Sequence, residues 1–292
     1  MQFNKATKKK AKLRAGLYSV AGGGKTMTAL LIAKGIGGKV AFIDTEHGSA
    51  SKYSDLFEFD VCEIDSFNPK ELIKGLEDIP SEYDTVIIDS MSAFWQGKDG
   101  ILQQVENAGK RNQGGNSFRA WADVSPVLNR INDLVMGAPY HVITTLRAKT
   151  EYVVEQNDKG KAAPRKIGLA PVYKEGWEYN LDFVARMDTD NTMIVEKTRI
   201  PEFAGLVVNK PDEEIGKRLA AWLGDGEAMP SPIEQLQVLI AEVTTPEAFI
   251  KLASDRGHIK EGIKDLSKIP NEKVNYFLQN WNSIAPLLKD AT

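Results

Sequence analysis

The 292-residue sequence has very little cysteine and histidine, and each shortage argues against a kind of bond or site. The single cysteine, Cys62, cannot form a disulfide within the chain, and its apolar, strand-like surroundings lead us to expect a buried, inert thiol in a reducing cytoplasm. Histidines occur at positions 47, 141 and 258, without the spacing of metal ligands, which argues against a zinc site. No apolar run approaches the length of a membrane span, and the N-terminus lacks the apolar segment of a secretory signal. We therefore expect a cytoplasmic protein with no membrane partner.

An excess of charge of one sign is also missing. The chain has 37 Lys and Arg and 40 Asp and Glu, a net charge of −3, which argues against a uniformly basic nucleic-acid-binding protein. The N-terminal segment differs, because residues 1–14 contain cations and no acid. Such an arm either follows a phosphate backbone or remains a solvated, disordered tail, and the sequence leaves both open.

Residues 19–26 (SVAGGGKT) form the most informative stretch of the chain. They match the phosphate-loop pattern G-x-x-x-x-G-K-[ST] at Gly24, Lys25 and Thr26, with Ser19 in the place of the first glycine. A strand candidate precedes them and a helix candidate follows, which is the context of a phosphate loop rather than of a glycine-rich turn with a chance GKT. The sequence therefore predicts that the chain binds a nucleoside triphosphate.

The chemistry of phosphate binding explains the residue types in this loop. Glycines let backbone N–H groups close around phosphate oxygens, and the start of the following helix adds its positive dipole end. Lys25 is expected to reach the β- and γ-phosphates, and the Thr26 hydroxyl to bind Mg²⁺. The predicted nucleotide contacts are Ser19, Ala21, Gly22, Gly23, Gly24, Lys25, Thr26 and Met27.

The order of strand and helix candidates predicts an α/β fold followed by a small helical region. From residue 14 to about 224 the two alternate, which is typical of a mainly parallel sheet flanked by helices. Turn and linker residues gather at 224–232, and helix-start signals follow near 231, 245 and 270. We predict a basic arm at 1–13, an α/β core at 14–226 and a helical domain at 227–292. Expected strands after the phosphate loop are 39–44, 59–64, 85–89, 140–145, 181–187, 193–197 and 206–208, and expected helices are 69–79, 121–136 and 212–223.

Two acidic residues complete the chemistry of a phosphate loop. Asp89 closes the apolar run 85–89, where a carboxylate of the Mg²⁺ shell is expected at the end of a buried strand. Glu46 lies just beyond the strand 39–44, at the carboxyl edge where ligands bind in parallel sheets. It is a candidate to orient or deprotonate the attacking water. The alternative for any single loop glutamate is a solvated surface residue.

The phrase FIDTEHG at 42–48 resembles RecA-type recombinases, in which a strand of the form F-I-D-x-E-H delivers the catalytic glutamate. The resemblance covers roughly residues 14–224 and implies a RecA-like twisted sheet that binds ATP and Mg²⁺ and hydrolyses ATP. It makes Glu46 the catalytic glutamate, and it matches Asp89-Ser90 to the Mg²⁺-site Asp-Ser of the family.

Two later segments extend the resemblance. Residues 144–149 (TTLRAK) match the segment that senses the γ-phosphate and leads into a DNA-binding loop, with Thr145 where the recombinases have a switch glutamine. Residues 195–199 (VEKTR) match the strand whose two basic residues reach the ATP of a neighbouring protomer. The implied catalytic residues are Glu46, Lys25, Lys197, Arg199 and Thr145, and Thr26 and Asp89 are the implied metal-site residues.

Because a short basic arm precedes the core, the layout looks like the phage-encoded single-strand-annealing ATPases, which keep only the RecA core. This resemblance implies an ATP-dependent recombination protein that binds single-stranded DNA and works alongside a single-strand-binding protein in a bacterial host. It also implies self-assembly through ATP interfaces, as a ring or a filament. Annealing and strand exchange both remain open.

Two segments have the composition of DNA-binding loops. Residues 110–121 and 159–174 are rich in cations and contain aromatic side chains, Phe118, Trp121 and Tyr173, that would stack on bases. Alternatively, Phe118 and Trp121 start a helix that packs on the core, and 159–166 is an exposed hairpin tip. The predicted DNA contacts are Lys110, Arg111, Phe118, Arg119, Arg147, Lys149, Lys159, Lys161, Arg165 and Lys166.

Other functions remain compatible with the same core. A RecA-fold helicase or helicase loader also uses a glutamate after the second strand, although no helicase-specific segment stands out. A weakly hydrolysing scaffold, whose C-terminal helices recruit a partner, would not need Glu46. A small-molecule kinase is less well supported, because no basic lid is recognisable.

Overall fold

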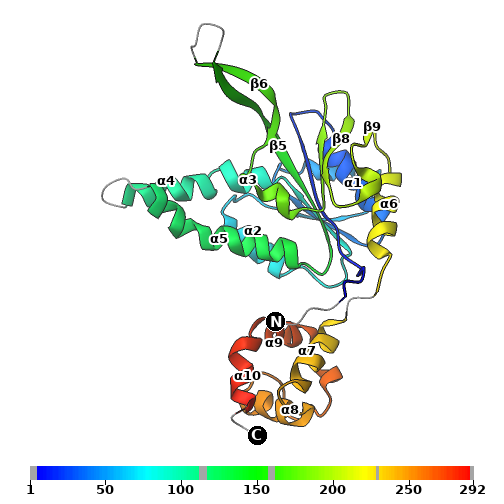
Figure 1. Cartoon of the computed structure of the whole chain (residues 1–292), viewed down its shortest axis with the longest axis vertical. Coiled ribbons are helices and arrows are strands. Elements are labelled where there is room, and N and C mark those ends of the chain that lie inside the picture. Colours follow the sequence, from blue (N-terminus) through cyan, green and yellow to red (C-terminus); the bar gives the residue numbers. More distant parts are fainter. Residues whose placement is uncertain (1–4, 112–116, 157–161, 228–229, 290–292) are drawn as a thin grey trace. The chain divides into compact units, whose positions relative to one another are not determined.

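The computed structural model describes residues 5–111, 117–156, 162–227 and 230–289 (Figure 1). The chain divides into two compact units, Ala11–Asp225 and a second unit formed by Met1–Lys10 with Gly226–Thr292. Part of the basic arm belongs to the second unit because its backbone pairs there: Lys10 N–H donates to the Glu227 carbonyl, and Glu227 N–H donates to that of Lys8, both at 2.9 Å. Among the described residues, no helix is long and apolar enough to cross a membrane.

The larger unit is built on a nine-stranded sheet with the order β3-β2-β4-β5-β1-β7-β8-β9, and β6 pairs with β5. Strands β1, β2, β3, β4, β5 and β7 run parallel to one another, whereas β8, β9 and β6 join antiparallel. The mainly parallel α/β fold predicted from the sequence is therefore confirmed. The strands are β1 (Arg14–Ser19), β2 (Val40–Asp44), β3 (Asp60–Glu63), β4 (Thr85–Asp89), β5 (His141–Gln156), β6 (Ala162–Pro171), β7 (Phe183–Met187), β8 (Thr192–Thr198) and β9 (Val207–Asn209).

Helices cover both faces of this sheet because its central strands are apolar on both sides. Helices α1 (Lys25–Ile36) and α6 (Glu214–Gly224) pack on one face, around Leu17, Ile32 and Leu219. Helices α2, α3 and α5 pack on the other, around Ile88, Phe94 and Val135. Their bounds are α2 (Pro69–Glu77), α3 (Met91–Gln96), α4 (Ile101–Arg111), which packs on α5, and α5 (Ser117–Gly137). Short 3₁₀ turns lie at Ala50–Tyr53, Trp177–Asn180 and Pro201–Phe203.

The C-terminal unit is helical, as predicted. It contains α7 (Pro232–Ala241), α8 (Pro246–Asp255), a 3₁₀ turn at Leu266–Lys268, α9 (Asn271–Gln279) and α10 (Trp281–Lys289). Two of the expected helix starts carry side-chain caps, because the Ser231 and Thr245 hydroxyls accept hydrogen bonds from the first turns of α7 and α8. Its core forms around Leu236, Phe249 and Phe277.

Two local expectations were wrong. Cys62 is exposed rather than buried, because β3 is an edge strand whose residues all face solvent. The strand expected at 140–145 continues to Gln156 and returns as β6, so it forms a long hairpin that extends beyond the sheet (Figure 1). In addition, helices α3 and α4 lie in a stretch for which no element was predicted, since α3 is short and α4 is rich in polar residues.

Buried polar side chains hold together the amino-terminal ends of the parallel strands β1 and β5. The Arg14 guanidinium donates to the Tyr140 carbonyl at 2.8 Å and to the Met136 and Ala138 carbonyls at the end of α5. Leu13 N–H donates to Nδ1 of His141 at 3.0 Å, so this ring must be unprotonated at Nδ1. Burial lowers the pKa of His141 from 6.5 to about 4.

This depressed pKa predicts a pH-dependent stability. The folded chain binds the His141 proton less readily than the unfolded chain, so the free energy of unfolding should fall as the pH drops from about 6.5 towards 4, by about 3 kcal/mol in all. His141→Asn, which keeps an acceptor and does not titrate, should remove this part of the slope. Urea unfolding at several pH values measures the difference. His47→Asn, at an exposed histidine, is the control, and an unchanged slope in His141→Asn contradicts the assignment.

Candidate nucleotide-binding site

Strand register brings the predicted nucleotide-site residues to one edge of the sheet. Asp44 pairs with Asp89 across β2 and β4, and Ile88 pairs with Thr144 across β4 and β5. Ser19, the last residue of β1, pairs with Arg147 of β5. The carboxyl ends of β1, β2, β4 and β5 therefore meet where the glycine loop enters α1, as expected for a ligand site of a parallel sheet.

The glycine loop has the backbone that its composition predicts. Gly22 and Gly24 have φ of 80° and 83°, values that side chains disfavour. A Cβ on Gly23 would lie 2.6 Å from Ser19 Oγ, and one on Gly24 would lie 2.9 Å from Asn191 Nδ2. Asn191, in the turn between β7 and β8, donates to the Gly22 carbonyl at 3.3 Å. Asn191 was not predicted as a site residue, because the sequence signals a turn at this position but not that the turn lies beside the glycine loop.

Lys25 begins α1 and is partly buried. Its Nζ lies 3.1 Å from Ser19 Oγ and 3.3 Å from the Val20 carbonyl. The serine in the place of the first glycine therefore supplies a hydrogen-bond acceptor for the lysine. Burial lowers the pKa of Lys25, while the nearby Asp89 and Glu46 carboxylates oppose that shift. The loop thus surrounds the Lys25 ammonium group with oxygen acceptors, and a phosphate oxygen can replace these acceptors.

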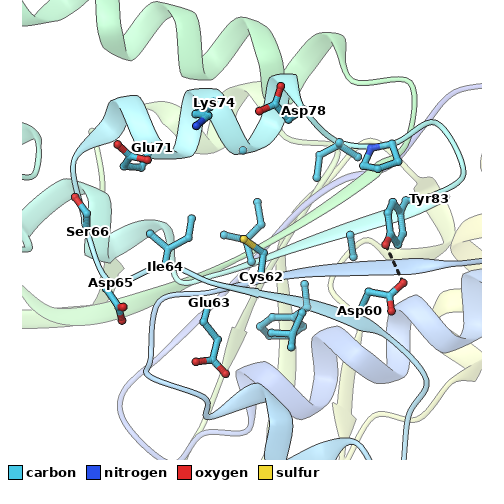
Figure 2. A pocket seen from close by; sticks show the side chains of 17 residues that line it. Asp60, Cys62, Glu63, Ile64, Asp65, Ser66, Glu71, Lys74, Asp78 and Tyr83 are labelled. Carbon is cyan, nitrogen blue, oxygen red and sulfur yellow. Dashed lines mark hydrogen bonds between the residues drawn. The ribbon is translucent and has the colours of Figure 1, made fainter.

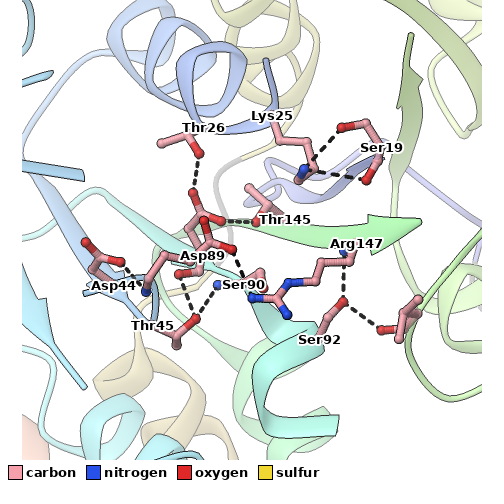
Figure 3. Close-up of polar contacts among 12 residues, drawn as sticks. Ser19, Lys25, Thr26, Asp44, Thr45, Asp89, Ser90, Ser92, Thr145 and Arg147 are labelled. Atoms are coloured by element: carbon pink, nitrogen blue, oxygen red, sulfur yellow. Dashed lines mark hydrogen bonds and ion pairs between the residues drawn. The ribbon is translucent and has the colours of Figure 1, made fainter. Parts of the chain in front are cut away.

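Asp89 is a buried carboxylate at the end of β4 (Figure 3). Thr26 Oγ1 donates to its Oδ2 at 2.5 Å, and the Thr145 hydroxyl donates to its Oδ1. Burial raises the pKa of Asp89, and these two hydrogen bonds counteract the rise. The neighbouring Ser90 hydroxyl is buried and, among the described residues, has no hydrogen-bond partner. One carboxylate with hydroxyl oxygens fits a Mg²⁺ ion that takes its other ligands from phosphates and water.

Glu46 is held just beyond β2 by its own loop. Asp44, which is buried, accepts from Glu46 N–H at 2.6 Å and from Ala50 N–H at 3.0 Å. Thr45 N–H and Oγ1 donate to the Asp89 carbonyl at 2.8 and 3.0 Å, which ties the ends of β2 and β4 together. Neither Asp44 nor Thr45 was predicted as a site residue, although both lie in the phrase that identified Glu46. The Glu46 carboxylate pairs with Arg147, Oε1 to Nη2, at 3.3 Å.

Lys197 and Arg199 do not join this cluster. Arg199 N–H donates to the Asp182 carbonyl, and Asp182 N–H donates to that of Arg14, so Arg199 is level with the start of β1. Ser19 lies five residues further along β1, about 16 Å away at ~3.3 Å per residue. The side chains also point to the opposite edge: Lys197 Nζ donates to the Leu181 carbonyl, and Arg199 pairs with Asp182 at 2.9 Å.

In the first predicted DNA segment, the described residues 110–111 and 117–121 are helical, and residues 112–116 lie outside the described residues. Lys110 and Arg111 end α4, where Lys110 pairs with Glu106 at 2.6 Å, and Phe118 and Arg119 lie in the first turn of α5. Phe118 is 82% exposed. Trp121 instead stacks on Trp95, with ring centroids 5.9 Å apart, which corresponds to the packing alternative.

The second predicted DNA segment, residues 159–174, contains β6, which pairs with β5 in a hairpin. Arg147 and Lys149 are exposed on β5, and Arg165 and Lys166 belong to β6, whereas Lys159 and Lys161 lie outside the described residues. The expectation that Tyr173 is available for base stacking was wrong. Tyr173 is 9% exposed because it packs between Trp95 and Trp177.

A separate groove of about 590 Å³ lies between β3 and α2 (Figure 2). Its lining includes Cys62, Ile64 and Tyr83, and its rim carries carboxylates such as Glu63 and Glu71. The predicted site residues do not line it, so this groove is separate from the candidate nucleotide site.

The contact between Thr145 and Asp89 predicts a change in metal affinity. Thr145→Val keeps the side-chain shape but removes a hydrogen bond to the carboxylate, so the Mg²⁺ concentration needed for half-maximal binding of a fluorescent ATP analogue should rise about tenfold. Thr144→Val is the matched control, because this neighbouring hydroxyl donates to the Ala15 carbonyl instead. Equal Mg²⁺ requirements in the two variants contradict the role of Thr145.

Comparisons with known proteins identify the family of the chain. The model of a family described as AAA domain matches residues 11–214. No curated protein matches the chain. A crystal structure of the RadB recombinase is similar to it, with 18% identity over 66% of this chain and 84% of that chain and a TM-score of 0.40. Because the family match spans more than half of the sequence and includes the phosphate loop, the chain belongs to the AAA domain family.

Proposed function

We propose that the protein is an ATP-dependent recombination protein that binds single-stranded DNA, with ATP and Mg²⁺ held at interfaces between protomers. Annealing or strand exchange would follow alongside a single-strand-binding protein, in the cytoplasm of a phage-infected bacterium. One observation carries the proposal: a single strand, β5, contains Thr145, which bonds the buried Asp89, and continues through Arg147 and Lys149 into the projecting hairpin. Nucleotide site and candidate DNA surface are thus parts of one strand.

At the nucleotide site, each residue has a defined task. The backbone N–H groups of Gly22–Gly24 and Lys25 bind the phosphates, while Thr26 and Asp89 would hold Mg²⁺. The bound metal and nucleotide supply a polarised γ-phosphoryl group and its leaving ADP. Glu46 orients the attacking water and accepts its proton, and the Thr145 hydroxyl keeps Asp89 in place.

The position of Lys197 and Arg199 supports a shared site. Since both point to the sheet edge opposite the glycine loop, they cannot reach the phosphates of their own protomer. A second protomer stacked on that edge would receive them beside its ATP, the arrangement of a head-to-tail interface. Cations supplied in trans in this way contribute about 10³–10⁵ in rate in other phosphoryl-transfer proteins.

The cations of β5 and β6 support the choice of DNA as partner. Arg147 and Lys149 occupy alternate positions of β5, so their side chains emerge on the same side of the strand. Arg165 and Lys166 lie on β6, opposite Val153 and Tyr152. A flexible single strand can follow such a projecting ribbon, because its phosphates adapt to the spacing of the cations.

ATP hydrolysis without DNA, with single-stranded DNA and with duplex DNA tests this function. We expect single-stranded DNA, but not duplex DNA, to stimulate ATP hydrolysis strongly. Glu46→Gln should lower the hydrolysis rate at least about 10²-fold, the usual effect of removing a general base. Lys25→Ala should abolish ATP binding. Glu46-dependent hydrolysis that ignores DNA would point to a partner-driven ATPase, and full function in Glu46→Gln would point to a scaffold.

Mixing inactive variants tests the shared site. Glu46→Gln has intact trans cations, whereas the double variant Lys197→Ala/Arg199→Ala has an intact Glu46. In an equal mixture about one quarter of head-to-tail interfaces combine both intact halves, so DNA-dependent hydrolysis should return to a measurable fraction of the wild-type rate. A mixture of Glu46→Gln with Lys25→Ala is the control, because these defects lie on the same side of the interface. Equal absence of activity in both mixtures argues against trans action.

A further inference from the structure

The predicted catalytic glutamate is already engaged. Glu46 Oε1 lies 3.3 Å from Nη2 of Arg147, and the two side chains are 37% and 50% exposed. A carboxylate oxygen that accepts from a guanidinium has fewer lone-pair positions left for a water, and the pair fixes its direction. In this arrangement, the ion pair directs one oxygen of the Glu46 carboxylate towards Arg147.

The backbone of Arg147 is fixed at the base of the hairpin (Figure 3). Its N–H donates to Ser92 Oγ at 2.9 Å, and its carbonyl accepts from Val172 N–H at 2.7 Å. Ser92 Oγ in turn donates to the Val172 carbonyl at 2.7 Å. Arg147 thus joins α3, which follows Asp89 and Ser90, to both strands at the point where the hairpin leaves the sheet. The side chain can change partner while its backbone stays anchored.

The Arg147 guanidinium is also a group that can bind a phosphate. Arginine binds a phosphate with two parallel hydrogen bonds, as it does a carboxylate. A partly exposed ion pair is weak, because water and salt screen it. A DNA phosphate held nearby by Lys149, which is exposed on the same strand, would therefore compete for Arg147.

We propose that Arg147 is a positioning residue that makes hydrolysis depend on DNA. Without DNA it holds Glu46 in an ion pair, and when a phosphate of single-stranded DNA takes the guanidinium, the carboxylate is released to orient the water. The inference rests on the proposed function and names how its partner regulates the same site. Because the coupling is reciprocal, loss of Glu46 must also favour DNA binding through Arg147.

A double-mutant cycle without nucleotide tests the competition directly. Anisotropy of a fluorescent single-stranded oligonucleotide gives the Kd of wild type, Glu46→Gln, Arg147→Ala and the double variant. We expect Glu46→Gln to tighten binding about two- to fivefold when Arg147 is present, the range of an exposed ion pair, and to have no effect in the Arg147→Ala background. The same factor in both backgrounds would reflect a general loss of negative charge and would overturn the proposal.

A second ion pair supplies the matched control. Arg130 and Glu77 are 2.5 Å apart and 44% and 43% exposed, but they join α5 to α2 away from the site. The cycle of Glu77→Gln and Arg130→Ala should show no coupling to DNA binding. If it shows the same coupling as Glu46 and Arg147, the effect belongs to bulk charge.

Hydrolysis without DNA gives the second measurement. Arg147→Ala should raise the DNA-free rate at least about twofold, since Glu46 is no longer held, and added DNA should stimulate it little further. Arg130→Ala should keep the wild-type rates. A DNA-free rate at or below wild type in Arg147→Ala overturns the proposal. Failure of the proposed role of Arg147 is distinguishable from failure of the proposed function. If the wild-type protein neither binds single-stranded DNA nor hydrolyses ATP faster in its presence, the proposed function itself is contradicted.

Discussion

The carboxylate of Asp89 is the group on which the rest of the core depends. It is buried at the end of β4, and burial of a carboxylate is costly unless hydrogen bonds compensate for the lost water. The donors are Thr26, from the helix behind the glycine loop, and Thr145, from β5. Three segments far apart in the sequence must meet to satisfy one charge, so the packing of the central sheet and the assembly of the site rely on the same contacts.

Features that depend on a few adjacent residues could be predicted from the sequence. The glycine loop, the helix behind it and the acidic end of β4 each have a local signal, because strand, turn and helix-start residues follow one another directly. The same holds for the capped helix starts at Ser231 and Thr245. Parallel order then places Asp89 and Glu46 at one edge, since the carboxyl ends of neighbouring parallel strands coincide.

Features that depend on pairing between distant residues could not be predicted. Cys62 was expected to be buried because its neighbours are apolar, but only the strand order shows that β3 is at the edge. Tyr173 lies in a segment with the composition of a DNA-binding loop, but it is buried by the nearby Trp177 and by Trp95, which is distant in the sequence. The role of Asn191 as a support of the glycine loop likewise requires the β7–β8 turn to fold beside it.

The two departures from the recombinase pattern find a common explanation in the geometry. Ser19 adds a hydroxyl where the pattern has a glycine, and Thr145 puts a shorter hydroxyl side chain where the pattern has a glutamine. Both are buried and bonded within the site, Ser19 to Lys25 and Thr145 to Asp89. The Thr145 hydroxyl is already engaged in its hydrogen bond to Asp89. We infer that communication along β5 passes instead through the longer side chain two residues on, Arg147, whose weak pair with Glu46 is easier to exchange than a buried hydrogen bond.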